Sequence, residues 1–313
     1  MSQFDDLRER VFALYAERRF VEMRGLLDGA AERFPSRRSA ITYWKACIDS
    51  LLGDPTQALQ RLRRGAEEGL FWPENALHTD PDLTAVRSLP GFEEMVESVR
   101  RSAERANMTR PERPEVLLIA PEAEPVRGRL IALHMYNRTA AESAPYWQSA
   151  TEIGLVVVVP ESTQVSGDGE PAWTNAAMTA RDLRLARQEA LSRFPQGGLA
   201  TVIGGASQGG GRAAAIALTG DPFDCRGLVG VVSAYPDLPD VPAAAQVAAG
   251  RGLRAYLLTG DQDGTRDQVE HLHADLTAGG VETELDVVPG LGHDFPDDFP
   301  GRLRRAVTNI LDV

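Results

Sequence analysis

The run at residues 155–160, LVVVVP, is the feature that most constrains the fold of this chain. It places four valines in succession with no polar residue between them. A strand with one face in water alternates apolar and polar residues, so an unbroken apolar run indicates a strand buried on both faces. Such burial is typical of a parallel sheet that carries helices on each side.

Strand-like and helix-like segments alternate from residue 115 to the end of the chain. The pattern predicts a doubly wound, mostly parallel sheet of the α/β class. No large lid is expected, because a helical segment begins soon after the strand at 228–233. The expected strands are 116–120, 129–134, 155–160, the residues before Ser207, 228–233, 253–259 and 284–288, and the expected helices include 140–152, 175–194, 208–218, 266–278 and 302–311.

Residues 1–105 show a different pattern, in which apolar residues recur at helical spacing and no alternating run occurs. The following segment is charged and contains two prolines, RPERP at its end, which is typical of a connection. A chain of 313 residues is long enough for about two domains. We therefore predict an all-helical domain over 1–105, a linker over 106–114 and an α/β domain over 115–313.

The helical part contains a weak internal repeat. Residues 19–23 align with residues 54–58 at an offset of 35, close to the 34-residue period of tetratricopeptide repeats. Residues 69–92, GLFWPENALHTDPDLTAVRSLPGF, also resemble the closing segment of such domains. The resemblance implies a helical domain that closes over the site of the other domain or binds a protein partner, whereas a plain helical bundle is the alternative.

The stretch GGASQGG contains the pattern Gly-x-Ser-x-Gly, with Ser207 between an apolar strand and a helix of small residues. A serine on such a sharp turn presents its hydroxyl at the end of the sheet, and its neighbours must be small because the chain passes close to them. The pattern resembles the nucleophile elbow of the α/β-hydrolases. The pattern therefore predicts Ser207 as a nucleophile.

An acid and a histidine follow in the order that α/β-hydrolases use. Asp261 and Asp263 come after the strand at 253–259, and His293 comes after the strand at 284–288. Both loops lie at the carboxyl edge of the sheet, where the elbow also opens. His293 is then the general base for Ser207, and a carboxylate orients it. Both aspartates remain candidates. Asp263 is preferred, because family members commonly place the acid three residues after the glycine that ends this strand.

Residues 115–313 resemble the carboxylesterase and dienelactone-hydrolase-like branch of the α/β-hydrolases. Two backbone amides must stabilise the oxyanion, and one is expected from Gln208, directly after the nucleophile. The resemblance implies that the second is the amide of Tyr136. That branch carries His-Gly-x-Gly in this loop, whereas this chain has Met135 and Asn137 in place of the glycines.

Residues 146–173 also resemble a group of predicted esterases without an assigned substrate. In that group Trp173 would open the helix before the elbow strand and lie near the substrate pocket, with core packing as the alternative. Trp147 is expected in the core.

Composition narrows the possible partners. The net charge of −12 and the pI of about 5.0 argue against nucleic acid or an anionic membrane as the main partner. The two cysteines, Cys47 and Cys225, are remote in sequence and form neither a disulfide framework nor a zinc motif. The amino-terminal segment lacks the apolar core of a signal peptide, and no apolar run is long enough to span a bilayer. A cytoplasmic location is therefore expected.

These features together predict a serine hydrolase for carboxylic esters. Ser207, His293 and Asp263 would act through an acyl-enzyme, and neither a metal nor an organic cofactor is required. A peptidase or a thioesterase would use the same residues. A repeat-type binding protein with a weakly active hydrolase domain is the other alternative, because Met135 and Asn137 replace glycines of the oxyanion loop.

Overall fold

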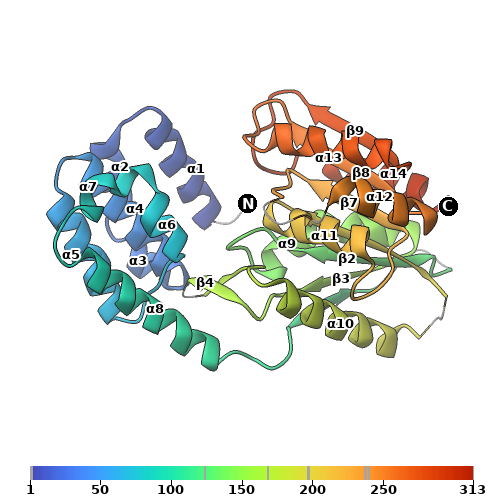
Figure 1. Ribbon diagram of the computed structural model, residues 1–313, viewed down its shortest axis with the longest axis horizontal. Coiled ribbons are helices and arrows are strands. Elements are labelled where there is room, and N and C mark those ends of the chain that lie inside the picture. The colour runs from blue at the N-terminus through green and yellow to red at the C-terminus, as the bar shows by residue number, and fades with distance from the viewer. Residues whose placement is uncertain are drawn as a thin grey trace. The chain divides into compact units, whose positions relative to one another are not determined.

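The computed structural model describes residues 3–122, 125–167, 169–195, 198–235, 238 and 240–312. The chain forms two compact units (Figure 1). The first unit consists of Met1–Arg110 together with Val165–Glu170, and the second consists of Pro111–Gln164 together with Pro171–Val313. None of the described helices is both long and apolar enough to cross a membrane.

The second unit is organised around a seven-stranded sheet with the strand order β1-β3-β2-β6-β7-β8-β9. Strand β1 runs antiparallel to β3, and the other neighbouring strands are parallel. The prediction of a mostly parallel sheet is confirmed. The strands are β1 (Val116–Ile119), β2 (Gly128–Leu133), β3 (Leu155–Pro160), β6 (Ala200–Ala206), β7 (Gly227–Val231), β8 (Arg254–Gly260) and β9 (Glu282–Val288).

Helices cover both faces of this sheet (Figure 1). Along β3, Val156 and Val158 pack into one apolar cluster, and Val157 and Val159 pack into another on the opposite face. This explains why the strand is apolar at every position. One cluster includes residues of α10 (Ala176–Arg193), α11 (Gln208–Thr219), α12 (Val241–Gly250) and α13 (Arg266–Ala278), and the other includes residues of α9 (Ala140–Trp147), the 3-10 helix η3 (Gln148–Ile153) and α14 (Phe299–Leu311).

The connection after β7 is short, as predicted. Strand β7 ends at Val231 and α12 begins at Val241, so this connection has no room for a lid domain. Trp147 is fully buried and packs edge-on against Phe295 and Phe299, which confirms that it belongs to the core.

All regular elements within the described residues 3–110 are helices. Helix α8 continues to Met108, so the first residues of the predicted linker are helical, and Ala106 packs against the apolar cluster of this unit. The elements are α1 (Gln3–Ala16), α2 (Phe20–Leu26), α3 (Ala30–Arg33), η1 (Pro35–Arg37), α4 (Arg38–Leu51), α5 (Pro55–Glu67), α6 (Glu74–Thr79), η2 (Pro81–Leu83), α7 (Thr84–Arg87) and α8 (Phe92–Met108).

A small hairpin of β4 (Val165–Gly167) and β5 (Glu170–Pro171) contributes residues 165–170 to this helical unit. Val165 packs against the apolar cluster that contains residues of α5 and α8. The carboxylate of Glu170 accepts a hydrogen bond of 3.1 Å from the backbone N–H of Ala40, in the first turn of α4. The first N–H groups of a helix lack partners within the helix, so a carboxylate is favourable there. No feature of the sequence predicted this packing.

Candidate active site

Ser207 lies on a strained turn between β6 and α11. Its φ of +52° and ψ of −123° place it in a region that residues other than glycine rarely adopt. Backbone hydrogen bonds hold the turn against the next strand, because Ser207 N–H donates to the carbonyl of Val231 and Ser207 O accepts from Ala234 N–H. The sequence pattern predicted such a turn, and the backbone has this conformation.

The glycines around Ser207 are needed because other main-chain atoms lie very close to them. A Cβ atom at Gly205 would collide with the backbone of Gly209. A Cβ atom at Gly209 would collide with the carbonyl oxygens of Leu133 and His134, at the end of β2. The first turn of α11 therefore packs directly on the neighbouring strand, which only glycine permits.

The structure brings Ser207, His293 and Asp263 into one hydrogen-bonded chain. The Nε2 atom of His293 is 2.8 Å from the Oγ atom of Ser207, and its Nδ1 atom is 2.8 Å from Oδ1 of Asp263. A carboxylate can only accept hydrogen bonds, so Nδ1 carries the proton and Nε2 is left to accept one from the serine. The three residues follow β6, β8 and β9, so all lie at the carboxyl ends of parallel strands.

The Asp263 carboxylate is fully buried and satisfied by hydrogen bonds. Its Oδ2 accepts from the hydroxyls of Thr259 and Thr265 at 3.0 and 2.8 Å, and its Oδ1 accepts from Thr265 N–H at 3.0 Å. Burial alone would raise the pKa of Asp263, but the hydrogen bonds from Thr265 and His293 outweigh it and hold the pKa below its usual value. The group therefore stays a carboxylate at neutral pH.

Asp261, the other acid that the sequence left open, has a different contact. Its Oδ1 accepts a hydrogen bond of 2.7 Å from Gly290 N–H, in the loop that leads to His293. Of the two aspartates, the structure brings Asp263 to the imidazole and leaves Asp261 to hold this loop.

The two predicted oxyanion donors lie on the elbow helix and on the loop after β2. Gln208 is the first residue of α11, where an N–H has no acceptor within the helix. Tyr136 lies in a turn closed by a bond from Arg138 N–H to Met135 O. Asn137 in this turn has a φ of +59°. Asparagine tolerates this left-handed region better than most residues, so the turn forms although it lacks the glycine.

His134 and Trp173 support the main chain of this loop, a role that the sequence analysis did not predict. The ring of His134 is fully buried; its Nδ1 donates to Met135 O at 2.8 Å, and its Nε2 accepts from Ser162 N–H at 3.1 Å. Trp173 stacks on this ring, with centroids 4.6 Å apart, and its Nε1 donates to His134 O.

Trp173 also connects the loop to the elbow helix. Its backbone N–H donates to Oε1 of Gln208 at 2.8 Å, and its carbonyl accepts from Nε of Arg212 at 2.9 Å. The indole has no exposed surface. Of the two alternatives that the sequence left open for Trp173, this placement favours core packing over a position next to the substrate pocket.

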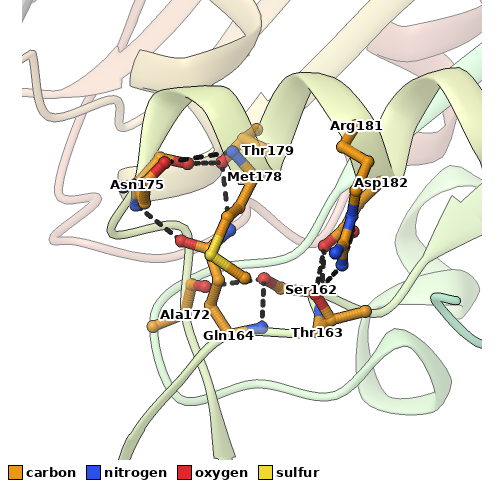
Figure 2. A network of polar contacts seen from close by, with 9 residues as sticks. All are labelled: Ser162, Thr163, Gln164, Ala172, Asn175, Met178, Thr179, Arg181 and Asp182. Carbon is orange, nitrogen blue, oxygen red and sulfur yellow. Dashed lines mark hydrogen bonds and ion pairs between the residues drawn. The ribbon is translucent and has the colours of Figure 1, made fainter. Parts of the chain in front are cut away.

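The segments on both sides of the hairpin are anchored to α10 (Figure 2). Asp182 accepts hydrogen bonds from the N–H and the hydroxyl of Thr163 at 3.0 and 2.8 Å. Ser162 donates to the carbonyl of Ala172 at 2.7 Å, and Gln164 accepts from the hydroxyl of Thr174. These bonds fix residues 162–164 against residues 172–175, and so hold Ser162 and Trp173 next to the ring of His134.

We predict that His134 makes the stability of the protein sensitive to acid. Burial lowers the pKa of His134 to about 4. In the unfolded chain the imidazole takes up a proton below about pH 6.5, whereas in the folded chain it stays neutral until about pH 4. Folding stability is therefore lost as the pH falls through this window, by about 2 kcal/mol between pH 7 and pH 5.

His134→Phe keeps an aromatic ring against Trp173 and removes this titration. Urea unfolding of both proteins at pH 7 and pH 5 measures the effect. The variant should be less stable at pH 7, because Ser162 N–H loses its acceptor, and should lose less stability on acidification than the parent. An equal loss in the two proteins would contradict the prediction.

No protein-family model matches this chain, and no curated protein does. Among solved structures, an uncharacterized protein from Bacillus cereus ATCC 10987 is 24% identical, and the match covers 100% of this chain and 99% of that one with a TM-score of 0.56. Zea mays acyl-protein thioesterase 2 is 16% identical, with 63% of this chain and 99% of that chain covered and a TM-score of 0.52.

A thermostable carboxyl esterase from Bacillus coagulans, solved in complex with glycerol, is 14% identical over 63% of this chain and 94% of its own, with a TM-score of 0.52. At these identities the likeness concerns the fold. The chain shares the α/β-hydrolase fold of these esterase and thioesterase structures.

Proposed function

We propose that the second unit is a serine hydrolase that cleaves carboxylic esters through an acyl-enzyme. The observation that carries the proposal is the continuous hydrogen-bonded chain from Ser207 through His293 to Asp263. Nε2 of His293 takes the hydroxyl proton as Ser207 Oγ attacks the ester carbon, and then gives it to the departing alcohol. In the second step His293 takes a proton from a water molecule, which attacks the acyl carbon, and the proton then passes to Ser207 Oγ as the acid is released.

In this mechanism Asp263 keeps the imidazole in the tautomer that can accept the serine proton, and it stabilises the imidazolium once it forms. The amides of Gln208 and Tyr136 are proposed to bind the oxyanion. Each such donor contributes about 10²- to 10³-fold to kcat in enzymes of this type.

Thioesters are a second candidate substrate class. One of the solved structures with this fold is an acyl-protein thioesterase, and the same three residues would cleave a thioester. Oxygen esters and thioesters with matched acyl chains, measured over a range of chain lengths, would distinguish the two classes.

We further infer that the helical unit is a tetratricopeptide-like domain and that this protein is located in the cytoplasm. Helix α5 begins 35 residues after α2, at Pro55 against Phe20. This spacing supports the repeat that the sequence predicted.

A fluorophosphonate probe tests the hydrolase proposal. The full chain should take up one label, and peptide mapping by mass spectrometry should place it on Ser207. The reagent needs a serine activated by a base, so heat-denatured protein provides the control and should remain unlabelled. Absence of labelling in the folded protein would contradict the proposal.

A further inference from the structure

The helical unit contains a cavity that the proposed hydrolase chemistry does not use. It has a volume of about 580 Å³ and lies among α1, α4 and the segment from α6 to η2. Its walls include Phe12 and Tyr15 of α1 and Tyr43 and Trp44 of α4. Phe12 is 52% exposed and Tyr15 is 38% exposed. A cavity of this size with aromatic walls is typical of a site for a small ligand or a short segment of a polypeptide.

Two carboxylates, Asp80 and Asp82, line the same cavity. Tyr43 donates a hydrogen bond of 3.0 Å to Oδ2 of Asp80, and Tyr15 donates one of 3.0 Å to Oδ1 of Asp82. Oδ1 of Asp80 accepts from the N–H of Asp82 at 2.9 Å. These hydrogen bonds fix the positions of both the tyrosine rings and the carboxylates.

Neither carboxylate forms an ion pair with a described residue, and no lysine, arginine or histidine is among the residues that line the cavity. The guanidinium of Arg87 lies nearby, but it donates to the backbone carbonyl of Asp80 at 2.7 Å and to neither carboxylate. Oδ2 of Asp82 has no hydrogen-bond donor among the described residues. Burial and the nearby charge of Asp80 raise the pKa of Asp82, which a bound cation would reverse.

We propose that this cavity binds the side chain of a lysine in a peptide segment of a partner protein. The ammonium would donate to the open Oδ2 of Asp82 and be attracted by the aromatic faces, while its alkyl stem packs on the same rings. The cavity is larger than one such side chain, which leaves room for the residues next to it.

A metal ion fits the cavity less well than an organic cation. Cys47 offers its sulfur within 4.8 Å of ligand atoms of Asp80 and Asp82. Burial raises the pKa of the Cys47 thiol, and the charge of Asp80 raises it further. The sulfur therefore stays protonated, whereas a metal binds the thiolate. The aromatic walls offer no ligands to a metal, and they do attract an ammonium on an apolar chain.

Calorimetric titration of the full chain with two model peptides tests this proposal. The probes are acetyl-Ala-Lys-Ala-amide and the same peptide with norleucine, which has the alkyl chain without the ammonium. The Ser207→Ala protein is used, so that no hydrolysis accompanies binding. The lysine peptide should bind at least tenfold more tightly than the norleucine peptide, and 0.5 M NaCl should weaken it.

Three variants locate the site. Asp82→Asn should weaken the lysine peptide at least tenfold without affecting the norleucine peptide. Phe12→Ala, which removes a half-exposed aromatic wall of the cavity, should weaken both peptides several-fold. Glu67→Gln removes an exposed charge of α5 outside the cavity, so it should change neither affinity.

The proposal would be overturned by equal affinities for the two peptides, or by an Asp82→Asn protein that binds like its parent. Binding of 1,5-diaminopentane as tightly as the lysine peptide would overturn the assignment to a polypeptide. Stoichiometric Zn²⁺ binding that displaces the peptide and depends on Cys47 would overturn the choice of an organic cation. These results are independent of ester hydrolysis, because the cavity is lined by residues 12–82 alone.

Discussion

Replacement of Ser207 by alanine should lower kcat for a short-chain p-nitrophenyl ester by about 10⁶-fold. The serine oxygen is the atom that the proposed acyl-enzyme requires, and Ser207 Oγ lies 2.8 Å from the only ring nitrogen of His293 left to accept its proton. The variant should remain folded, since the change removes one half-buried hydroxyl from a turn that backbone hydrogen bonds already hold.

Kinetics must be paired with a test of folding for this variant. Circular dichroism and the thermal midpoint should match those of the parent protein. Ser192→Ala, which changes an exposed serine of α10, serves as the control and should retain full activity. His293→Ala should cost about as much as Ser207→Ala, and the double variant little more, because the residues act as one unit. A Ser207→Ala protein with a tenth of the parent activity would show that another group is the nucleophile.

Local patterns in the sequence were sufficient to predict the sheet and to place Ser207, His293 and a pair of candidate aspartates at its edge. The unbroken valines of β3 indicated burial on two faces, and the glycines around Ser207 indicated a close approach of main chains. The order of the parallel strands then places the residues after β6, β8 and β9 on one edge. These inferences depend on periodicity and on strand direction, which a single sequence records.

The support of the oxyanion loop depends on contacts between distant segments, which leave no local pattern. His134 directly follows β2 and continues its apolar run in the sequence, yet its ring bonds to Ser162 and stacks on Trp173. A polar run directly after the buried β3, Ser162-Thr163-Gln164, was the available signal for this network. The hairpin residue Glu170 likewise caps α4 from 130 positions away in the chain.

The choice between the two aspartates was also open in the sequence, because both follow β8 within three residues of its end. In the structure, hydrogen bonds from Thr259 and Thr265 hold the Asp263 carboxylate toward His293. The sequence does not show that these two threonines bond to Asp263, because the contacts depend on the conformation of the turn between them. Asp261 instead accepts a hydrogen bond from Gly290 N–H, in the loop that leads to His293.

Asp263→Asn should lower kcat by about 10⁴-fold and leave KM nearly unchanged. An asparagine amide can donate to Nδ1, which favours the imidazole tautomer with its proton on Nε2, and that tautomer cannot accept the proton of Ser207. Loss of the negative charge also removes the stabilisation of the imidazolium in the transition state. Steady-state kinetics with the same ester measures the effect, and urea unfolding confirms that the variant is folded.

Asp261→Asn is the matched control, because it makes the same chemical change two residues away. Its side-chain carbonyl can still accept from Gly290 N–H, so the loop that leads to His293 should keep its position. We expect kcat within about threefold of the parent value, since an exposed neutral hydrogen bond replaces a charged one. A loss of activity in Asp261→Asn as large as that in Asp263→Asn would contradict the assignment of Asp263, because the Asp261 carboxylate is bound to Gly290 N–H and not to the imidazole.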